Sequence, residues 1–269
     1  MPKHEYNATV TQRVEIAPGL IILRVVPNGS LLAFEAGQYT VLGLRRSAPR
    51  IEGTDPEEDK GQPDKLIRRA YSIASSSQDS EYLEFYVSLV PSGELTPRLF
   101  CLGLKDRLFL GPKSTGLFTL DRVPEDHHVL LVCTGTGLAP YMSMLRSQLS
   151  CGGPQRFVVL HGSRYSWDLG YRSELESLDR HCPNMTYLPS ISRPTEDPSW
   201  QGLSGYLQDI LASGVVEERT GLELNPGMFH IFLCGNPAMI EAAKPRLLER
   251  GFVQDRGREA GSLHIEEYW

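Results

Sequence analysis

The chain has 269 residues, which is long enough for one large domain or two of ordinary size with a substantial core. A formal net charge of −6 argues against a nucleic-acid-binding protein, because such proteins are usually basic. The start of the sequence lacks the apolar run of a signal peptide, and no stretch approaches the length of a membrane span. We therefore expect a soluble, cytoplasmic protein that binds neither nucleic acid nor membrane.

The cysteines are scattered, odd in number and without a C-x-x-C pair. This pattern argues against a disulfide scaffold, a structural zinc site and a protein-held iron–sulfur cluster. We expect no metal site and a reducing compartment. The five residues are Cys101, Cys133, Cys151, Cys182 and Cys234.

Short apolar or alternating runs, broken by Gly, Pro and Ser, fill the first part of the chain from residue 9 to about 120. Examples are "LIILRVVP" at 20–27 and "YLEFYVSLVP" at 82–91. Strands at this spacing, without long helical patterns between them, predict an antiparallel β-barrel or sandwich. Residues 48–66 are polar and rich in Gly and Pro, and we expect a mobile surface loop there.

From about residue 128 continuous apolar strands alternate with helical patterns. "HVLLVCTGTG" at 128–137 is a buried strand that runs into glycines, and "AMIEAAKPRLLER" at 238–250 is a helix that Pro245 should bend or break. Such alternation predicts a doubly wound parallel α/β sheet. The boundaries that we predict are 1–122 for the barrel domain and 123–269 for the α/β domain.

Two glycine turns follow apolar strands in the second domain. "CTGTGLAPY" opens a helix after the first strand, where glycines let a backbone approach phosphates and the helix N-terminus favours an anion. Its G-x-G-x-x-P spacing is not the full dinucleotide fingerprint, so a purely structural turn remains open. "CGNPAM" at 234–239 repeats the pattern. Neighbouring strand ends would join both turns in one crevice, toward which Cys234 would point unless it is a small buried thiol.

The strand "RRAYSIASS" at 68–76 carries a charge, a phenol and a hydroxyl beside small residues. Arg69 could hold a pyrophosphate, Tyr71 could lie against a planar ring, and Ser72 could hydrogen-bond a ring heteroatom. The alternative is an edge strand with its arginine outward and its tyrosine half-buried.

Motifs in both halves resemble one family. In order they include "RAYSIAS", "EFYVSLVPSGELTPRL", "TGTGLAPYMSML", "LCGNPAMI" and the terminal "EEYW". This set resembles the ferredoxin–NADP⁺ reductase family, and within it the bacterial flavodoxin/ferredoxin reductases. The resemblance covers nearly the whole chain apart from the 48–66 loop.

The resemblance implies a bound FAD. Arg69 would pair with its pyrophosphate, Tyr71 would stack on the isoalloxazine ring, and Ser72 would lie near N5, which receives hydride. Tyr268 would cover the ring where nicotinamide must come, and Trp269 would stack on the adenine. The implied FAD contacts are Arg69, Ala70, Tyr71, Ser72, Tyr86, Glu94, Leu95, Thr96, Thr134, Tyr268 and Trp269.

The resemblance also implies that NADP(H) is a substrate. Tyr206 stands where the family often has an arginine for the 2′-phosphate, and a lost charge-assisted contact is worth on the order of 1.5–3 kcal/mol. The implied NADP contacts are Thr134, Gly135, Gly137, Ser163, Arg164, Ser192, Arg193, Tyr206, Cys234 and Gly235. The implied catalytic residues are Ser72, Cys234, Glu266 and Tyr268.

The resemblance thus implies an oxidoreductase that exchanges electrons between NADP(H) and ferredoxin or flavodoxin through FAD. We expect a monomer that meets its carrier through transient electrostatic contact. A basic patch could receive the carrier, or it could be a solvated charged loop. The alternatives are an NADH-linked reductase component for an oxygenase or free flavin, and a non-catalytic FAD-binding subunit. The patch candidates are Arg45, Arg46, Arg50, Lys65 and Arg68.

Overall fold

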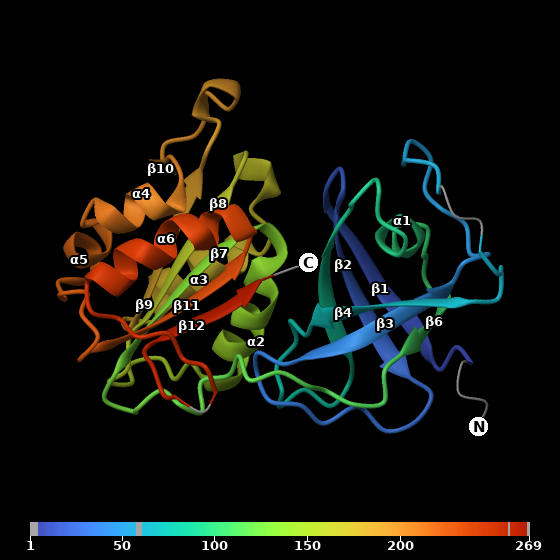
Figure 1. Ribbon diagram of the computed structural model, residues 1–269, viewed down its shortest axis with the longest axis horizontal. Helices are drawn as coiled ribbons and strands as arrows, with labels where there is room; N and C mark the ends of the chain where they lie inside the picture. The colour runs from blue at the N-terminus through green and yellow to red at the C-terminus, as the bar shows by residue number, and fades with distance from the viewer. Residues whose placement is uncertain (1–4, 58–60, 258, 268–269) are drawn as a thin grey trace. The chain divides into compact units, whose positions relative to one another are not determined.

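The structure is a computed structural model that describes residues 5–57, 61–257 and 259–267 (Figure 1). Its contacts divide the chain into two compact units. Unit 1 is Met1–Thr119 with Met142–Ser147, and unit 2 is Leu120–Tyr141 with Gln148–Trp269.

Six antiparallel strands form the sheet of unit 1, in the order β4-β3-β6-β1-β2-β5. A bridge between Ile73, just after β4, and Phe85 on β5 joins the two ends of this order. The sheet therefore closes on itself as a barrel, which leaves few unpaired backbone groups. The strands are β1 (Ala8–Ala17), β2 (Leu20–Pro27), β3 (Tyr39–Arg45), β4 (Leu66–Ser72), β5 (Leu83–Ser88) and β6 (Arg107–Leu110).

The core of unit 1 lies on the inner face of these strands. On β3 the buried residues Thr40, Leu42 and Leu44 alternate, as a sheet with one face toward a core requires. Helix α1 (Thr96–Leu99) has Pro97 in its first turn, where a missing N–H costs nothing. Its Leu99 packs into the same apolar cluster.

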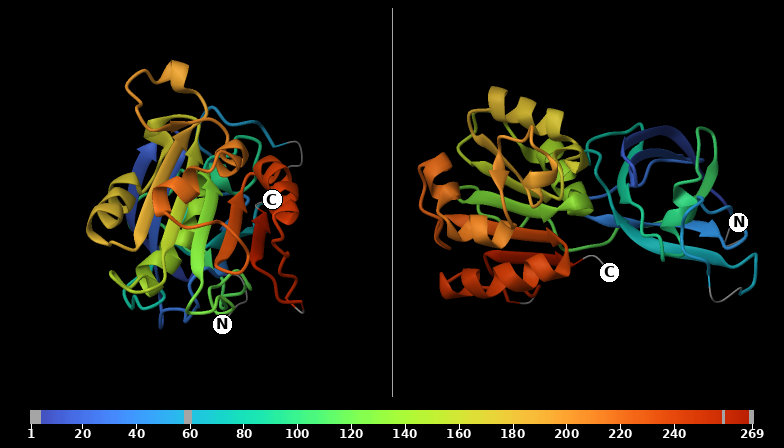
Figure 2. Two further views of the ribbon diagram at one scale, coloured as in Figure 1. Left: turned by 90° about the vertical axis from the view of Figure 1, so that its left-hand side faces the viewer. Right: turned by 90° about the horizontal axis from the view of Figure 1, so that it is seen from above.

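Six parallel strands form the sheet of unit 2, in the order β10-β9-β8-β7-β11-β12. Helices α4 to α6 pack on one face, and Figure 2 shows α3 on the other. Together with the barrel, this sheet confirms the predicted fold class. The strands are β7 (His128–Thr134), β8 (Phe157–Ser163), β9 (Met185–Ile191), β10 (Leu203–Ser204), β11 (Phe229–Gly235) and β12 (Leu263–Glu267). The helices are α2 (Ala139–Gln148), α3 (Arg172–His181), α4 (Leu207–Ala212), α5 (Val215–Thr220) and α6 (Pro237–Glu249).

Helix α6 runs through Pro245 to Glu249, so of the two expected outcomes, a bend or a break, the break is wrong. Proline removes one N–H and leaves one carbonyl, that of Glu241, without its helical donor. Glu241 is exposed, so water can solvate that carbonyl. The helix is also fixed elsewhere, because Met239, Ile240, Ala243 and Leu247 are buried against the sheet.

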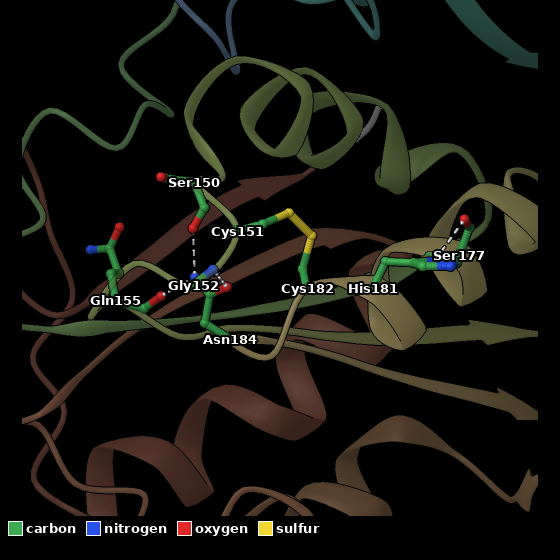
Figure 3. Close-up of a disulfide and its surroundings, with 8 residues drawn as sticks. All are labelled: Ser150, Cys151, Gly152, Gln155, Ser177, His181, Cys182 and Asn184. Atoms are coloured by element: carbon green, nitrogen blue, oxygen red, sulfur yellow. Dashed lines mark hydrogen bonds between the residues drawn. A yellow bond between two sulfur atoms is a disulfide. The ribbon is translucent and has the colours of Figure 1, made fainter.

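A disulfide joins Cys151, in the loop after α2, to Cys182 at the end of α3, with their Cα atoms 4.6 Å apart (Figure 3). Asn184 supports the loop, since its amide donates to the carbonyls of Ser150 and Gln155 at 3.0 and 2.9 Å. The sequence gives no indication of this bond. An odd count without C-x-x-C argues against a framework of several bridges, but it cannot detect one bridge across 31 residues.

No helix in the described part of the chain combines the length and the apolar character that crossing a bilayer requires. Within the same ranges, no group of three or more His, Cys, Asp or Glu side chains is placed to hold a metal ion.

Candidate functional site

The candidate residues of unit 1 begin on β4, which lies at one end of the sheet order and pairs along its length with β3. Arg69 and Tyr71 are two residues apart and therefore share one face of the strand. Arg69 is exposed, Tyr71 is half-buried and Ser72 is buried. Burial raises the pKa of the Tyr71 phenol, so its hydroxyl stays protonated at neutral pH. The strand presents a cation and an aromatic ring on the same face.

Arg69 is joined through Glu94 to a network of arginines and carboxylates. The Glu94 carboxylate accepts from Arg69 Nη2 at 2.5 Å and from Arg46 Nη2 at 2.6 Å. Glu57 accepts two hydrogen bonds from Arg98, at 2.6 and 2.9 Å, and one from Arg50 at 3.1 Å. Arg98 also donates to the carbonyl of Arg46, at 3.1 Å from its Nε, which links the two carboxylates. Hydrogen bonding from Arg98 lowers the pKa of Glu57, which therefore stays ionised.

This network bears on two expectations. Glu57 belongs to the 48–66 segment, whose described residues form a mostly exposed loop, and its carboxylate is held among arginines, so the loop is anchored at this residue. Arg46 is 8% exposed and Arg50 is half-buried, so neither belongs to a basic surface patch. Both arginines can lie away from solvent because the carboxylates of Glu57 and Glu94 pair with them. These pairs offset the free energy that removing a charge from water costs. The exposed candidates are Lys65 and Arg68, with Arg45 half-buried and paired to Asp64.

The other predicted FAD residues of unit 1 differ in how accessible their side chains are to a ligand. Ala70 is exposed, whereas Tyr86 and Leu95 are buried. The Thr96 hydroxyl donates to the carbonyl of Val90 at 3.2 Å and accepts from its N–H at 3.0 Å. That hydroxyl closes a turn, so it is already engaged within the barrel.

In unit 2 the two glycine turns lie at neighbouring strand ends, as the sequence analysis expects. β7 pairs with β11, with Cys133 opposite Cys234. The turns fit tightly: a Cβ on Gly137 would lie 2.5 Å from the carbonyl oxygen of Cys234, and one on Gly235, at φ +121°, would lie 2.5 Å from Thr134 Oγ1. Both positions therefore require glycine.

Parallel pairing also places two predicted catalytic residues side by side. Glu266 on β12 is opposite Cys234 on β11. Cys234 is fully buried and Glu266 is half-buried. On the same edge, the backbone N–H of Asn236 donates to Thr134 Oγ1 at 2.8 Å. Tyr268 and Trp269 lie outside the described residues.

The loops after β8 and β9 carry the residues predicted for the 2′-phosphate. Ser192 N donates to Ser163 O at 2.9 Å and Arg193 N donates to Arg164 O at 3.1 Å, so the two segments stay paired beyond the strands. Tyr206, just before α4, is 64% exposed. The residues predicted for the 2′-phosphate therefore come from three successive strand ends of the sheet order, those of β8, β9 and β10.

Three further side chains at this edge escaped the sequence analysis. Arg193 Nη1 donates to the Tyr165 hydroxyl at 3.0 Å, and that hydroxyl donates to Glu196 Oε2 at 2.7 Å. The hydrogen bond that Arg193 donates to Tyr165, together with the charge of Glu196, raises the pKa of Arg193. The Tyr165 and Trp167 rings stack with their centroids 4.6 Å apart. The sequence feature that could have pointed to Tyr165 and Trp167 is "RYSW", which places two aromatic residues directly after the end of β8.

Comparisons with known proteins bear on the family and the fold of the chain. Residues 131–245 match the oxidoreductase NAD-binding domain family. A flavodoxin/ferredoxin–NADP reductase of Buchnera aphidicola subsp. Baizongia pistaciae is 31% identical over 92% of this chain and 93% of its own. The protein of the same name from Escherichia coli is 32% identical over 90% of each chain.

Among solved structures, a ferredoxin NADP⁺ reductase from Neisseria gonorrhoeae, with bound FAD and NADP, superposes with a TM-score of 0.80. It shares 24% identity and the match covers 97% of each chain, a likeness that concerns the fold. The identities to the two curated relatives, over nine-tenths of both chains, go further. The chain is an oxidoreductase that belongs to the flavodoxin/ferredoxin–NADP reductase family.

Proposed function

We propose that this chain exchanges electrons between NADP(H), which gives or takes two as hydride, and ferredoxin or flavodoxin, which carry one, by means of bound FAD. The flavin supplies an acceptor that can hold two, one or no extra electrons. The observation that carries the proposal is the edge of unit 2, where two interlocked glycine turns meet Cys234 and Glu266.

The residues of unit 1 fit a flavin with a pyrophosphate. Four arginines and two glutamates make up the network behind β4, so these side chains carry a formal net charge of +2. An excess of cations suits the pyrophosphate anion, and the exposed guanidinium of Arg69 can bind it. Tyr71 would hold the isoalloxazine ring and Ser72 its N5 region, while the small, exposed Ala70 leaves room.

Two other groups of residues in unit 1 have supporting parts in the proposal. Glu94, Leu95 and Thr96 would contribute backbone groups to the FAD phosphates, since their side chains are engaged or buried. Tyr86 would border the flavin.

In unit 2 the glycine turns would let the coenzyme backbone approach closely. Thr134, Gly135, Gly137 and Gly235 would hold the nicotinamide half, because a coenzyme can approach glycines without meeting a Cβ. Cys234 would border the nicotinamide, and Glu266 beside it would hold or move a proton. Tyr268 and Trp269 would cover the flavin and its adenine.

The adenosine half would lie at the loops after β8 and β9. Arg164 and Arg193 would face the 2′-phosphate, with Ser163, Ser192 and Tyr206 beside them. A phosphate binds best to arginine, because its planar guanidinium donates two parallel hydrogen bonds.

The proposal includes a transient, electrostatic encounter with the carrier at Lys65, Arg68 and Arg45, by a monomer working in the cytoplasm. The Cys151–Cys182 disulfide is unusual for a reducing compartment. A bridge that is formed in the cell would therefore count against the cytoplasm.

The test is the visible spectrum of the purified protein, followed by anaerobic titration with NADPH and with NADH. A yellow protein whose flavin absorbance is bleached by NADPH supports the proposal. A colourless protein that takes up no FAD contradicts it. A yellow protein that oxidises neither coenzyme would instead indicate a non-catalytic FAD-binding subunit.

A further inference from the structure

Arg193 already has an acidic neighbour within unit 2. Its guanidinium lies 3.7 Å from a Glu196 carboxylate oxygen, and the Tyr165 hydroxyl bridges the two side chains. Glu196 ends the short turn Pro194–Glu196 that follows β9, and its N–H donates to the Arg193 carbonyl at 3.2 Å. The carboxylate is therefore held beside Arg193 by the backbone as well as by the bridge.

A carboxylate at this position has opposite effects on the two nicotinamide coenzymes. The 2′-phosphate of NADPH is close to a dianion at neutral pH, so Glu196 repels it and competes with it for Arg193. NADH has a 2′-hydroxyl instead, and an Asp or Glu that accepts a hydrogen bond from this hydroxyl is the usual means of binding NAD. The same residue thus weakens the binding of NADPH and permits or strengthens the binding of NADH.

The neighbouring residues do not restore the missing positive charge. Tyr206 is exposed and uncharged. The charge of Arg164 acts on Asp168, in the turn Ser166–Asp168 after β8, and so each of the two arginines has an acid nearby. Glu196 is 56% exposed, so it remains accessible to a coenzyme at this edge.

We propose that Glu196 is a coenzyme-selectivity residue, which holds Arg193 partly neutralised so that NADH serves as a second hydride donor alongside NADPH. The proposal rests on the proposed function in one respect, namely that this edge binds the adenosine half of a nicotinamide coenzyme. It concerns a positioning residue, since Glu196 acts on the phosphate through Arg193 and by its charge.

The experiment is the charge series Glu196→Gln and Glu196→Lys in the flavin-loaded protein. We expect kcat/KM for NADPH to rise about 3- to 10-fold in the glutamine variant and further in the lysine variant, mainly through KM. The value for NADH should stay within about twofold or fall. Higher salt should shrink the gain, because the site is exposed.

A second readout does not need the flavin. Calorimetric binding of 2′,5′-ADP, which carries the 2′-phosphate, is compared with that of 5′-ADP, which lacks it. We expect the 2′,5′-ADP affinity to follow the same series as NADPH while the 5′-ADP affinity stays constant. Glu249→Gln and Glu249→Lys are the matched controls, because Glu249 is an exposed glutamate at the far end of α6. These variants should change neither the NADPH/NADH ratio of kcat/KM nor the ratio of the 2′,5′-ADP and 5′-ADP affinities.

The inference fails if the Glu196 variants leave both the NADPH/NADH ratio and the 2′,5′-ADP/5′-ADP ratio unchanged, or if the Glu249 variants shift them equally. It fails also if wild-type protein binds neither nucleotide. Failure of the proposed function has another signature: neither coenzyme reduces a flavin, and the binding series alone then decides the role of Glu196.

Discussion

The two units handle charge in opposite ways. Unit 1 buries permanent charges, since Arg98 on α1 is 2% exposed and hydrogen-bonds both the Glu57 carboxylate and the Arg46 carbonyl. Unit 2 buries two histidines in their neutral form: burial lowers the pKa of His161 to about 3 and that of His264 to about 4. The charges of its candidate site lie at the exposed ends of the strands.

This difference suggests a division of labour. A buried network with excess positive charge is rigid and suits an anion that stays bound, as a flavin pyrophosphate would. An exposed arginine with an acid beside it interacts weakly and reversibly, which suits a substrate that must leave. Three predictions test the contrast.

The largest effect is expected for Arg98→Met, which removes the buried cation from the network. Glu57 would lose both hydrogen bonds from Arg98 and keep the one from Arg50, and the Arg46 carbonyl would lose its bonds from Arg98. Breaking a buried ion pair costs about 3–5 kcal/mol of unfolding free energy. Urea unfolding followed by circular dichroism measures this cost. Arg246→Met removes an exposed arginine paired with Asp209 and should cost less than about 1 kcal/mol. Equal costs in the two variants would show that burial of the network makes no difference.

An intermediate effect is expected from the buried histidines of unit 2. Nδ1 of His230 on β11 lies 2.9 Å from Nε2 of His264 on β12, which stacks on Phe232, with Asp255 and Arg122 nearby. In the unfolded chain His264 takes up a proton below a pKa of about 6.5, and in the folded chain only near 4. The unfolded state therefore binds more protons between these values, and stability falls as the pH drops through that window.

We expect this fall to reach about 1–3 kcal/mol by pH 4.5, measured by urea unfolding across the pH range. His264→Gln should flatten the profile between pH 6.5 and 4.5, whatever its stability at pH 7. His181→Gln, at an exposed position on α3, is the control and should keep the wild-type slope. A His264→Gln profile parallel to wild type would remove His264 as the cause.

The smallest effect in free energy is expected for Arg69→Ala at the exposed end of the unit 1 network. Loss of one charge-assisted hydrogen bond should weaken FAD binding by about tenfold or somewhat more, with little change in unfolding free energy. Equilibrium dialysis with FAD measures the affinity. Arg45→Ala removes a half-buried arginine that pairs with Asp64 outside this network, and it should leave the FAD affinity unchanged. If both variants lose the same affinity, Arg69 has no specific part in holding the flavin.

The features that sequence could predict are those with local patterns. Alternating runs such as Thr40, Leu42 and Leu44 indicate a strand with one buried face, and the turn at Gly135 and Gly137 follows directly from the strand before it. The resemblance in motif order then supplied the family and the candidate residues.

The features that sequence could not predict depend on partners distant in the chain. Glu57 and Arg98 are 41 residues apart, and the fold of unit 1 alone brings them together. Tyr165 reaches Glu196 because the loops after two neighbouring strands stay paired. The disulfide likewise depends on where the loop after α2 meets the end of α3.

The interlocked turns at Gly137 and Gly235 have an evolutionary consequence. Each glycine faces the backbone or side chain of the other turn at a separation that no real Cβ tolerates. A substitution at either position would push the two strand ends apart, and no change at the other can compensate, since that position already lacks a side chain. Natural variants should therefore keep both glycines. Where one has been replaced, the two turns no longer interlock, and the other glycine should then vary freely.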